Sequence, residues 1–244
     1  MILKTIVLVL ILMQQINVFA KEFQSGESQV KLIELYSSEG CSSCPPAEAQ
    51  LAKLTDHKNL WKTFVPINFH VDYWNRLGWV DPYSNAAFTE RQRSYARLWK
   101  VKTVYTPAFV SNGESLGSTL NIGGLLEESK KGNSIKITAN TVSVKKSYIV
   151  NISAANLDEK KVYQIHVALL GNGLVSDVTS GENKGEILIQ NFVALKHESK
   201  AYSGKGVTFE IKQPESLKVL KYGLALWITE QDQLAPLQVV GGYL

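Results

Sequence analysis

Hydrophobic and polar positions follow two different patterns along this chain, and the pattern changes near residue 133. Before that point, short apolar runs alternate with segments whose apolar residues recur every three or four positions. The first pattern is typical of buried strands and the second of amphipathic helices. The strands are predicted at 29–36, 64–73 and 104–110, and the helices at 41–54, at 84–99 and near 125–131.

After residue 133 the helical pattern disappears, and seven short apolar segments follow one another with turn residues between them. Strands at this regular spacing indicate an all-β sandwich. The fold class predicted from the patterns is therefore an α/β N-terminal domain over residues 21–133, followed by an all-β, sandwich-like C-terminal domain over residues 134–244.

The first twenty residues form a separate unit. Lys4 precedes an apolar run at 5–13, and small residues end the segment at Val18-Phe19-Ala20. This arrangement predicts a secretory signal peptide, residues 1–20, and export to the periplasm or the medium. The run is too short to span a bilayer, so no membrane span is expected after the signal is removed.

Charge excludes one class of partner. The net charge of +4 is too small to imply binding to nucleic acid. Arg91, Arg93 and Arg97 form a mild basic cluster at helical spacing, which we interpret as a solvated helix face.

The chain has only two cysteines, Cys41 and Cys44, and they are three residues apart. A bridge across so short a loop contributes little to stability through chain entropy. In an exported protein, a single C-x-x-C pair therefore favours redox chemistry over a stabilising role. An inert structural bridge remains as an alternative.

The surroundings of the pair carry a family resemblance. Cys41-Ser42-Ser43-Cys44 follows a strand and opens a helix, and Val104-Tyr105-Thr106-Pro107 precedes the tight-turn signal Asn112-Gly113. In these features residues 28–132 resemble the thioredoxin superfamily. Nearly the whole chain also resembles an uncharacterised family of secreted thioredoxin-like proteins, in the segments Gly40–Pro46, His70–Asn75, Leu77–Trp79, Asp81–Pro82 and Gly181–Gly185.

The resemblance implies a function and a set of roles. The protein would be an exported thiol–disulfide oxidoreductase with a thioredoxin-like N-terminal domain. Cys41 would be the nucleophile, activated at a helix N-terminus, and Cys44 would resolve the mixed disulfide. A cis Thr106–Pro107 bond would face the cysteines and position the substrate, a thiol-bearing or disulfide-bearing protein or a small thiol. No cofactor and no metal is assigned.

Other candidate residues leave alternatives open. Cys41, Cys44 and His70 together suit copper, so a copper-handling or non-catalytic binding protein is the second hypothesis. Glu34 is either a buried acid serving the inner cysteine or a solvent-facing strand residue. Trp74, Trp79 and Tyr83 either line a substrate groove or cap the core.

Overall fold

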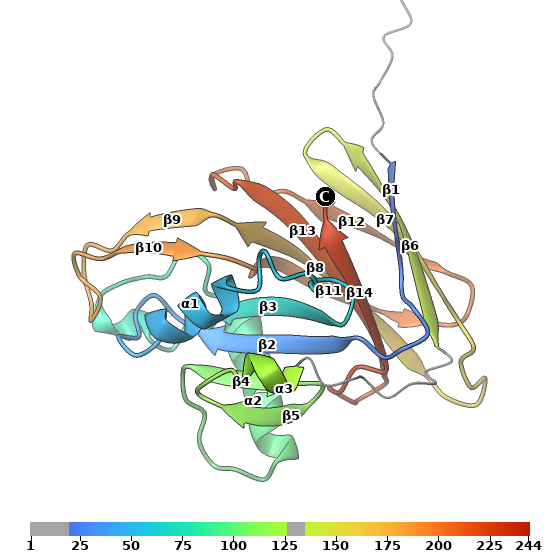
Figure 1. The fold of residues 1–244 in the computed structure, drawn as a ribbon, viewed down its shortest axis with the longest axis horizontal. Helices are drawn as coiled ribbons and strands as arrows, with labels where there is room; N and C mark the ends of the chain where they lie inside the picture. Colours follow the sequence, from blue (N-terminus) through green and yellow to red (C-terminus); the bar gives the residue numbers. More distant parts are fainter. Residues whose placement is uncertain (1–19, 126–134) are drawn as a thin grey trace, which may run out of the picture.

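The computed structural model describes residues 20–125 and 135–244 (Figure 1). The predicted signal peptide, apart from its last residue, lies outside the described residues. So do the predicted domain boundary at 133 and all but the first residue of the predicted helix 125–131. Among the described residues, no helix is long and apolar enough to cross a membrane.

An eight-stranded mixed sheet dominates the molecule, with the strand order β14-β13-β8-β11-β3-β2-β4-β5. Its strands are β2 (Lys31–Ser37), β3 (Phe64–His70), β4 (Ala108–Ser111), β5 (Glu114–Gly117), β8 (Tyr163–Asn172), β11 (Val193–Tyr202), β13 (Lys221–Glu230) and β14 (Gln238–Tyr243). A four-stranded sheet has the order β1-β6-β7-β12, with β1 (Ala20–Gln24), β6 (Lys136–Val144), β7 (Ser147–Ala155) and β12 (Val207–Lys212). The hairpin β9 (Leu174–Asp177) and β10 (Ile187–Gln190) forms the third sheet.

The predicted fold class, with a separate α/β thioredoxin-like N-terminal domain, is wrong. The fold is mostly β. Strands from both halves of the chain share the large sheet, so the N-terminal part does not form a sheet of its own (Figure 1). The two parts of that sheet join where β11 runs parallel to β3, with Val193 opposite Asn68. The Asn68 N–H donates to the Phe192 carbonyl at 2.7 Å. All seven residues of β3 are buried, so β3 is a central strand with neighbours on both sides rather than the edge of a small domain.

Helices cover both faces of the N-terminal part of the sheet. The helix α1 (Pro45–Ala52) packs through Ala47 and Leu51 on one face, while α2 (Ala86–Leu98) packs through Phe88 and Tyr95 on the other. The helix α3 (Ile122–Leu125) and the 3-10 turn η1 (Asn75–Leu77) are short. On the C-terminal part, the four-stranded sheet packs on β8 and β13 through one apolar core (the largest side chains being Phe23, Tyr148, Tyr163, Tyr202 and Phe209).

Local signals placed the element ends within a few residues. The helix α2 begins one residue later than predicted on its cap, because Asn85 rather than Ser84 accepts the Ala87 N–H, at 2.9 Å. The predicted hairpin at Asn112-Gly113 is confirmed as the turn between β4 and β5, with positive φ at both residues.

Candidate functional site

The two cysteines form a disulfide in the turn between β2 and α1. Their Cα atoms are 5.4 Å apart. Cys44 is the N-cap of α1, and the Cys44 carbonyl accepts the N–H of Glu48 at 3.1 Å. Cys41 therefore lies in the turn that precedes the helix, where the peptide N–H groups are not used by helical hydrogen bonds. Both cysteines are fully buried.

The Thr106–Pro107 peptide lies against this disulfide, although 65 residues separate Cys41 from Thr106. The bond is cis, as the family resemblance implies. The Thr106 carbonyl oxygen is 3.8 Å from Cys41 Sγ. The Ser43 hydroxyl bridges the two, at 3.3 Å from Cys41 Sγ and 3.5 Å from the Thr106 oxygen. The four predicted site residues thus converge at one place.

The Trp74 side chain holds the Thr106 loop in position. Its Nε1–H donates to Thr106 Oγ1 at 2.8 Å. The backbone of Gly40 lies so close to Trp74 that a Cβ added there would be 3.1 Å from the Trp74 Cβ. Trp74 therefore connects the segment before Cys41 to the segment before Pro107.

A segment from the C-terminal half of the chain lies over the Cys-x-x-Cys turn. The Glu182 carboxylate accepts the Ser42 N–H at 3.0 Å and the Ser42 hydroxyl at 2.8 Å, and these two bonds lower the pKa of Glu182. Asn183 Nδ2 donates to the carbonyls of Glu39 and Cys41, at 2.8 and 3.1 Å. The loop between β9 and β10 is thereby anchored directly on the disulfide turn.

A buried charged cluster lies beside the turn. His70 Nδ1 is 2.7 Å from Asp81 Oδ2, and neither side chain is exposed. Burial alone would lower the pKa of His70, but Asp81, Glu48 and Glu39 raise it to about 9. Burial would raise the pKa of Asp81, yet His70 and two backbone N–H groups hold it below its ordinary value. Asp81 also accepts the Glu39 N–H at 2.8 Å, which ties the cluster to the segment before Cys41.

Two further carboxyl groups complete this cluster. Burial, followed by the charge of Asp81, raises the pKa of Glu39 to about 7. Burial also raises the pKa of Glu48, which receives a 2.8 Å hydrogen bond from Gln190. In each of these two carboxyl groups, one buried oxygen (Oε1) has no hydrogen-bond partner. A carboxyl group with a raised pKa therefore lies two residues before Cys41.

The copper ligand set considered from the sequence does not match this geometry. Both ring nitrogens of His70 are engaged, Nδ1 by Asp81 and Nε2 by the Asn68 side-chain amide at 3.0 Å. Among the described residues, no group of three or more His, Cys, Asp or Glu side chains is arranged to hold a metal ion.

Glu34 is buried on the α2 face of the sheet, so the solvent-facing alternative is wrong. Arg91 binds it through two hydrogen bonds, Nε to Oε2 at 2.7 Å and Nη2 to Oε1 at 2.8 Å. Tyr95 and Tyr36 donate to the same carboxylate at 2.6 and 2.7 Å. The interpretation of Arg91 as a solvated residue is also wrong, because its side chain is 8% exposed.

The aromatic residues after β3 have separate roles. Trp74 binds the Thr106 loop, Trp79 donates to Glu39 Oε2 at 3.0 Å, and Tyr83 packs its ring against His70 with centroids 5.5 Å apart. They position the site's backbone and its buried acids.

Sequence reasoning missed Glu39, Asp81, Glu182 and Asn183 as site residues. Glu182 and Asn183 lie in a segment singled out only as a family likeness, some 140 residues from the cysteines. Asp81 could have been paired with His70 from its place in the Asp81-Pro82 motif. Glu39 carried no signal beyond its closeness to Cys41.

One comparison with known proteins shows a family. Residues 32–229 match the family model described as "Protein of unknown function (DUF1223)". No curated protein gives a significant match.

Two solved structures resemble the whole fold. A crystal structure of an Agrobacterium tumefaciens protein from a structural genomics consortium aligns with a TM-score of 0.61 and 21% identity, covering 90% of this chain and 96% of that one. HBP35 of Porphyromonas gingivalis aligns with a TM-score of 0.62 and 10% identity, covering 90% of this chain and 76% of that one. Likeness at these identities concerns the fold alone. Because the family model spans most of the sequence, the chain belongs to the DUF1223 family of proteins of unknown function.

Proposed function

We propose that this protein is an exported thiol–disulfide oxidoreductase whose reacting group is the Cys41–Cys44 pair. The observation that carries the proposal is the contact of Cys41 Sγ with the carbonyl that precedes the cis Pro107, at 3.8 Å. This pairing of a Cys-x-x-Cys turn with a cis-proline loop resembles the thioredoxin superfamily at the level of the site. Once the Ser43 hydroxyl separates from the Thr106 carbonyl, that carbonyl can pair with an extended substrate.

The exchange reaction proceeds in two balanced steps. A substrate thiolate attacks Cys41 Sγ, the Cys41–Cys44 bond breaks, and Cys44 leaves as a thiolate that takes up a proton. A second substrate thiolate then attacks the substrate sulfur of the mixed disulfide, and Cys41 leaves as a thiolate. The substrate dithiol becomes a disulfide, and its two electrons reside in the reduced protein pair. The reverse sequence reduces a substrate disulfide.

The Cys41 sulfur has the Ser43 hydroxyl within hydrogen-bonding distance, at 3.3 Å, and this hydroxyl can donate to a thiolate there. The dipole of α1 acts mainly on Cys44, which is the N-cap of that helix. Glu39, with its pKa near 7, suits proton exchange during the reaction. The Glu182 carboxylate disfavours a thiolate at Cys41, because it holds a negative charge next to the cysteine by accepting the Ser42 N–H.

The test is an exchange assay with matched cysteine variants. The oxidised wild-type protein is mixed with a reduced dithiol peptide, and formation of the peptide disulfide is followed by alkylation and mass spectrometry. Wild type is expected to oxidise one peptide per protein and to turn over when glutathione disulfide is present. C41S and C44S should lose turnover, and C44S should accumulate a mixed disulfide at Cys41. Turnover by C41S equal to that of wild type would refute the role of Cys41.

One observation favours a second candidate function, a binding protein with an inert bridge. Both cysteines are fully buried in the oxidised form, so a substrate reaches Cys41 only when its covering contacts separate. Those contacts include the Thr106 carbonyl and the hydrogen bonds made by Ser43, Glu182 and Asn183. An inert bridge would resist reduction in the native protein by millimolar thiols, whereas the proposed exchange site would be reduced without unfolding.

A further inference from the structure

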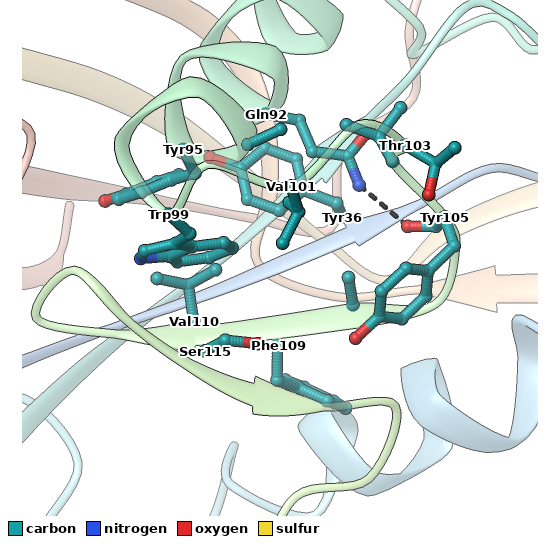
Figure 2. A pocket seen from close by; sticks show the side chains of 13 residues that line it. Tyr36, Gln92, Tyr95, Trp99, Val101, Thr103, Tyr105, Phe109, Val110 and Ser115 are labelled. Atoms are coloured by element: carbon teal, nitrogen blue, oxygen red, sulfur yellow. Dashed lines mark hydrogen bonds between the residues drawn. The ribbon is translucent and has the colours of Figure 1, made fainter.

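A cavity of about 310 Å³ lies between the end of α2, the loop at 99–107 and the hairpin β4–β5 (Figure 2). It is separate from the buried carboxyl cluster, since none of that cluster's residues lines it. The volume is at the lower end of the range for ligand-binding pockets. The space therefore suits one large side chain or a compact ligand rather than an extended one.

The lining is apolar and aromatic, and it carries no Asp, Glu, Lys or Arg. Figure 2 shows Trp99 and Tyr105 at opposite sides of the group of lining side chains, with Val101 between them. Tyr36 and Tyr95 contribute two further rings. A charged occupant would find no counter-ion in this cavity, so the chemistry of the walls selects a neutral apolar group.

Four of the polar side chains in the lining already have hydrogen-bond partners within the protein, namely Gln92, Trp99, Tyr36 and Tyr95. Gln92 donates to the Tyr105 carbonyl at 2.7 Å, and the Trp99 Nε1–H donates to the Gly113 carbonyl at 3.0 Å. The hydroxyls of Tyr36 and Tyr95 both donate to Glu34. An occupant would therefore gain mainly by burying apolar surface against these rings.

The position of the cavity connects it to the disulfide. Tyr105 and Ala108, which line the cavity, flank the Thr106–Pro107 peptide, and the Thr106 carbonyl contacts Cys41 Sγ. A substrate whose cysteine lies at Cys41 and whose chain runs along this loop would therefore bring one of its nearby side chains to the cavity.

We propose that this cavity is a specificity site, which receives an aromatic or large aliphatic side chain of a polypeptide substrate near the substrate's reacting cysteine. The proposal rests on the proposed exchange function and adds the substrate class to it. Val101 and Tyr105, which are 49% and 51% exposed, form the accessible part of the rim. Because the walls carry no charged side chain, the occupant is an apolar group. Because the lining continues into the Thr106–Pro107 loop, the occupant lies near the reacting cysteine of the substrate.

The test uses the C44S protein, which keeps Cys41 as a free thiol. Short neutral peptides carry one cysteine as a mixed disulfide with 5-thio-2-nitrobenzoate. The Cys41 thiolate attacks the peptide sulfur, the bond to thionitrobenzoate breaks, and the released thiolate is read by its absorbance. One peptide set has Trp placed two or three residues before or after the cysteine, and the reference peptide has Gly at all these positions.

The best Trp peptide is expected to react about tenfold faster than the Gly peptide, because a buried aromatic ring contributes at least that factor. V101W fills the rim and should bring the ratio of the two rates close to one. V162W is the matched control, since Val162 is a comparably exposed valine (57%) that does not line the cavity. It should keep the ratio of the parent.

Two outcomes separate this inference from the proposed function. If Cys41 reacts with both peptides at equal rates, the specificity site is refuted while thiol exchange stands. If Cys41 reacts with neither peptide, the exchange function fails. The cavity is then tested by calorimetry on wild-type protein with a Trp peptide carrying Ser in place of Cys. Absence of binding there, or equal binding by wild type and V101W, refutes the cavity as well.

Discussion

Replacing Arg91 by Met should strongly destabilise the protein. The guanidinium binds Glu34 at 2.7 and 2.8 Å, the Glu34 side chain is fully buried, and Arg91 is 8% exposed. The same group lies over the Trp227 and Tyr95 rings, 5.4 and 5.5 Å from their centroids. R91M leaves the carboxylate buried with only hydroxyl donors. Breaking one side of a buried pair in this way costs about 3–5 kcal/mol of unfolding free energy.

The assay is urea unfolding of the oxidised protein at neutral pH, with the slope m compared between variants so that the midpoint reports stability. R97M is the control on the same helix. Arg97 is 62% exposed in its pair with Glu90, so R97M should cost less than about 1 kcal/mol. The double variant E34Q/R91M should be more stable than R91M, because no buried charge then lacks a partner. An R91M protein no less stable than R97M would refute this reasoning.

Three further predictions concern the disulfide turn and its acids. Because the pKa of Glu39 is about 7 in the folded protein against 4.5 ordinarily, the folded state binds more protons, and stability falls as pH rises through that interval. E39Q should flatten this part of a stability–pH curve measured by urea unfolding, and an unchanged curve would contradict the assignment. The pKa of His70 is about 9 in the folded protein against 6.5 ordinarily. The stability that this shift contributes is fully present below pH 6.5 and is lost as the pH rises through 9. D81N should reduce the loss of stability between these two pH values and lower the stability at pH 6.5. E182Q should speed reduction of the native disulfide by dithiothreitol and raise its reduction potential, because the covering loop loses a charged anchor and a thiolate loses a negative neighbour. E186Q, in the same loop, should behave like wild type, and identical reduction rates for the two variants would exclude this role for Glu182.

Much of the site's arrangement could be predicted from the sequence because its signals are local. A Cys-x-x-Cys between a strand and a helix, and a proline just before a tight turn, each specify their own segment. The Cys41 and Thr106 contact then follows from the pairing of β4 beside β2. Helix ends were predicted to within a few residues for the same reason.

The fold class could not be predicted from local patterns, because the deciding contact is a single short pairing between β11 and β3. The apolar run of β3 predicts a strand, and its burial at every position is also typical of a strand with a neighbour on each side. That signal shows that β3 is central without showing which distant strand lies beside it.

The charged residues were misjudged for a related reason. Arg91 has helical spacing and charged neighbours, which is typical of a solvated face, yet the adjacent C-terminal strands bury it against Trp227. Glu182 and Asn183 reach the cysteine turn only because the β9–β10 hairpin extends back over it. In both cases the partner lies in the other half of the chain, where sequence periodicity carries no information about contact.

The reduction potential of the Cys41–Cys44 pair distinguishes an exchange site from an inert bridge. The native protein is equilibrated in glutathione buffers of graded ratio, and the oxidised fraction is measured by alkylation and mass spectrometry. A thiol–disulfide oxidoreductase predicts a potential above about −300 mV, with reduction complete in folded protein. A potential below about −300 mV, or reduction only after unfolding, would contradict the proposed function and identify the pair as a structural disulfide.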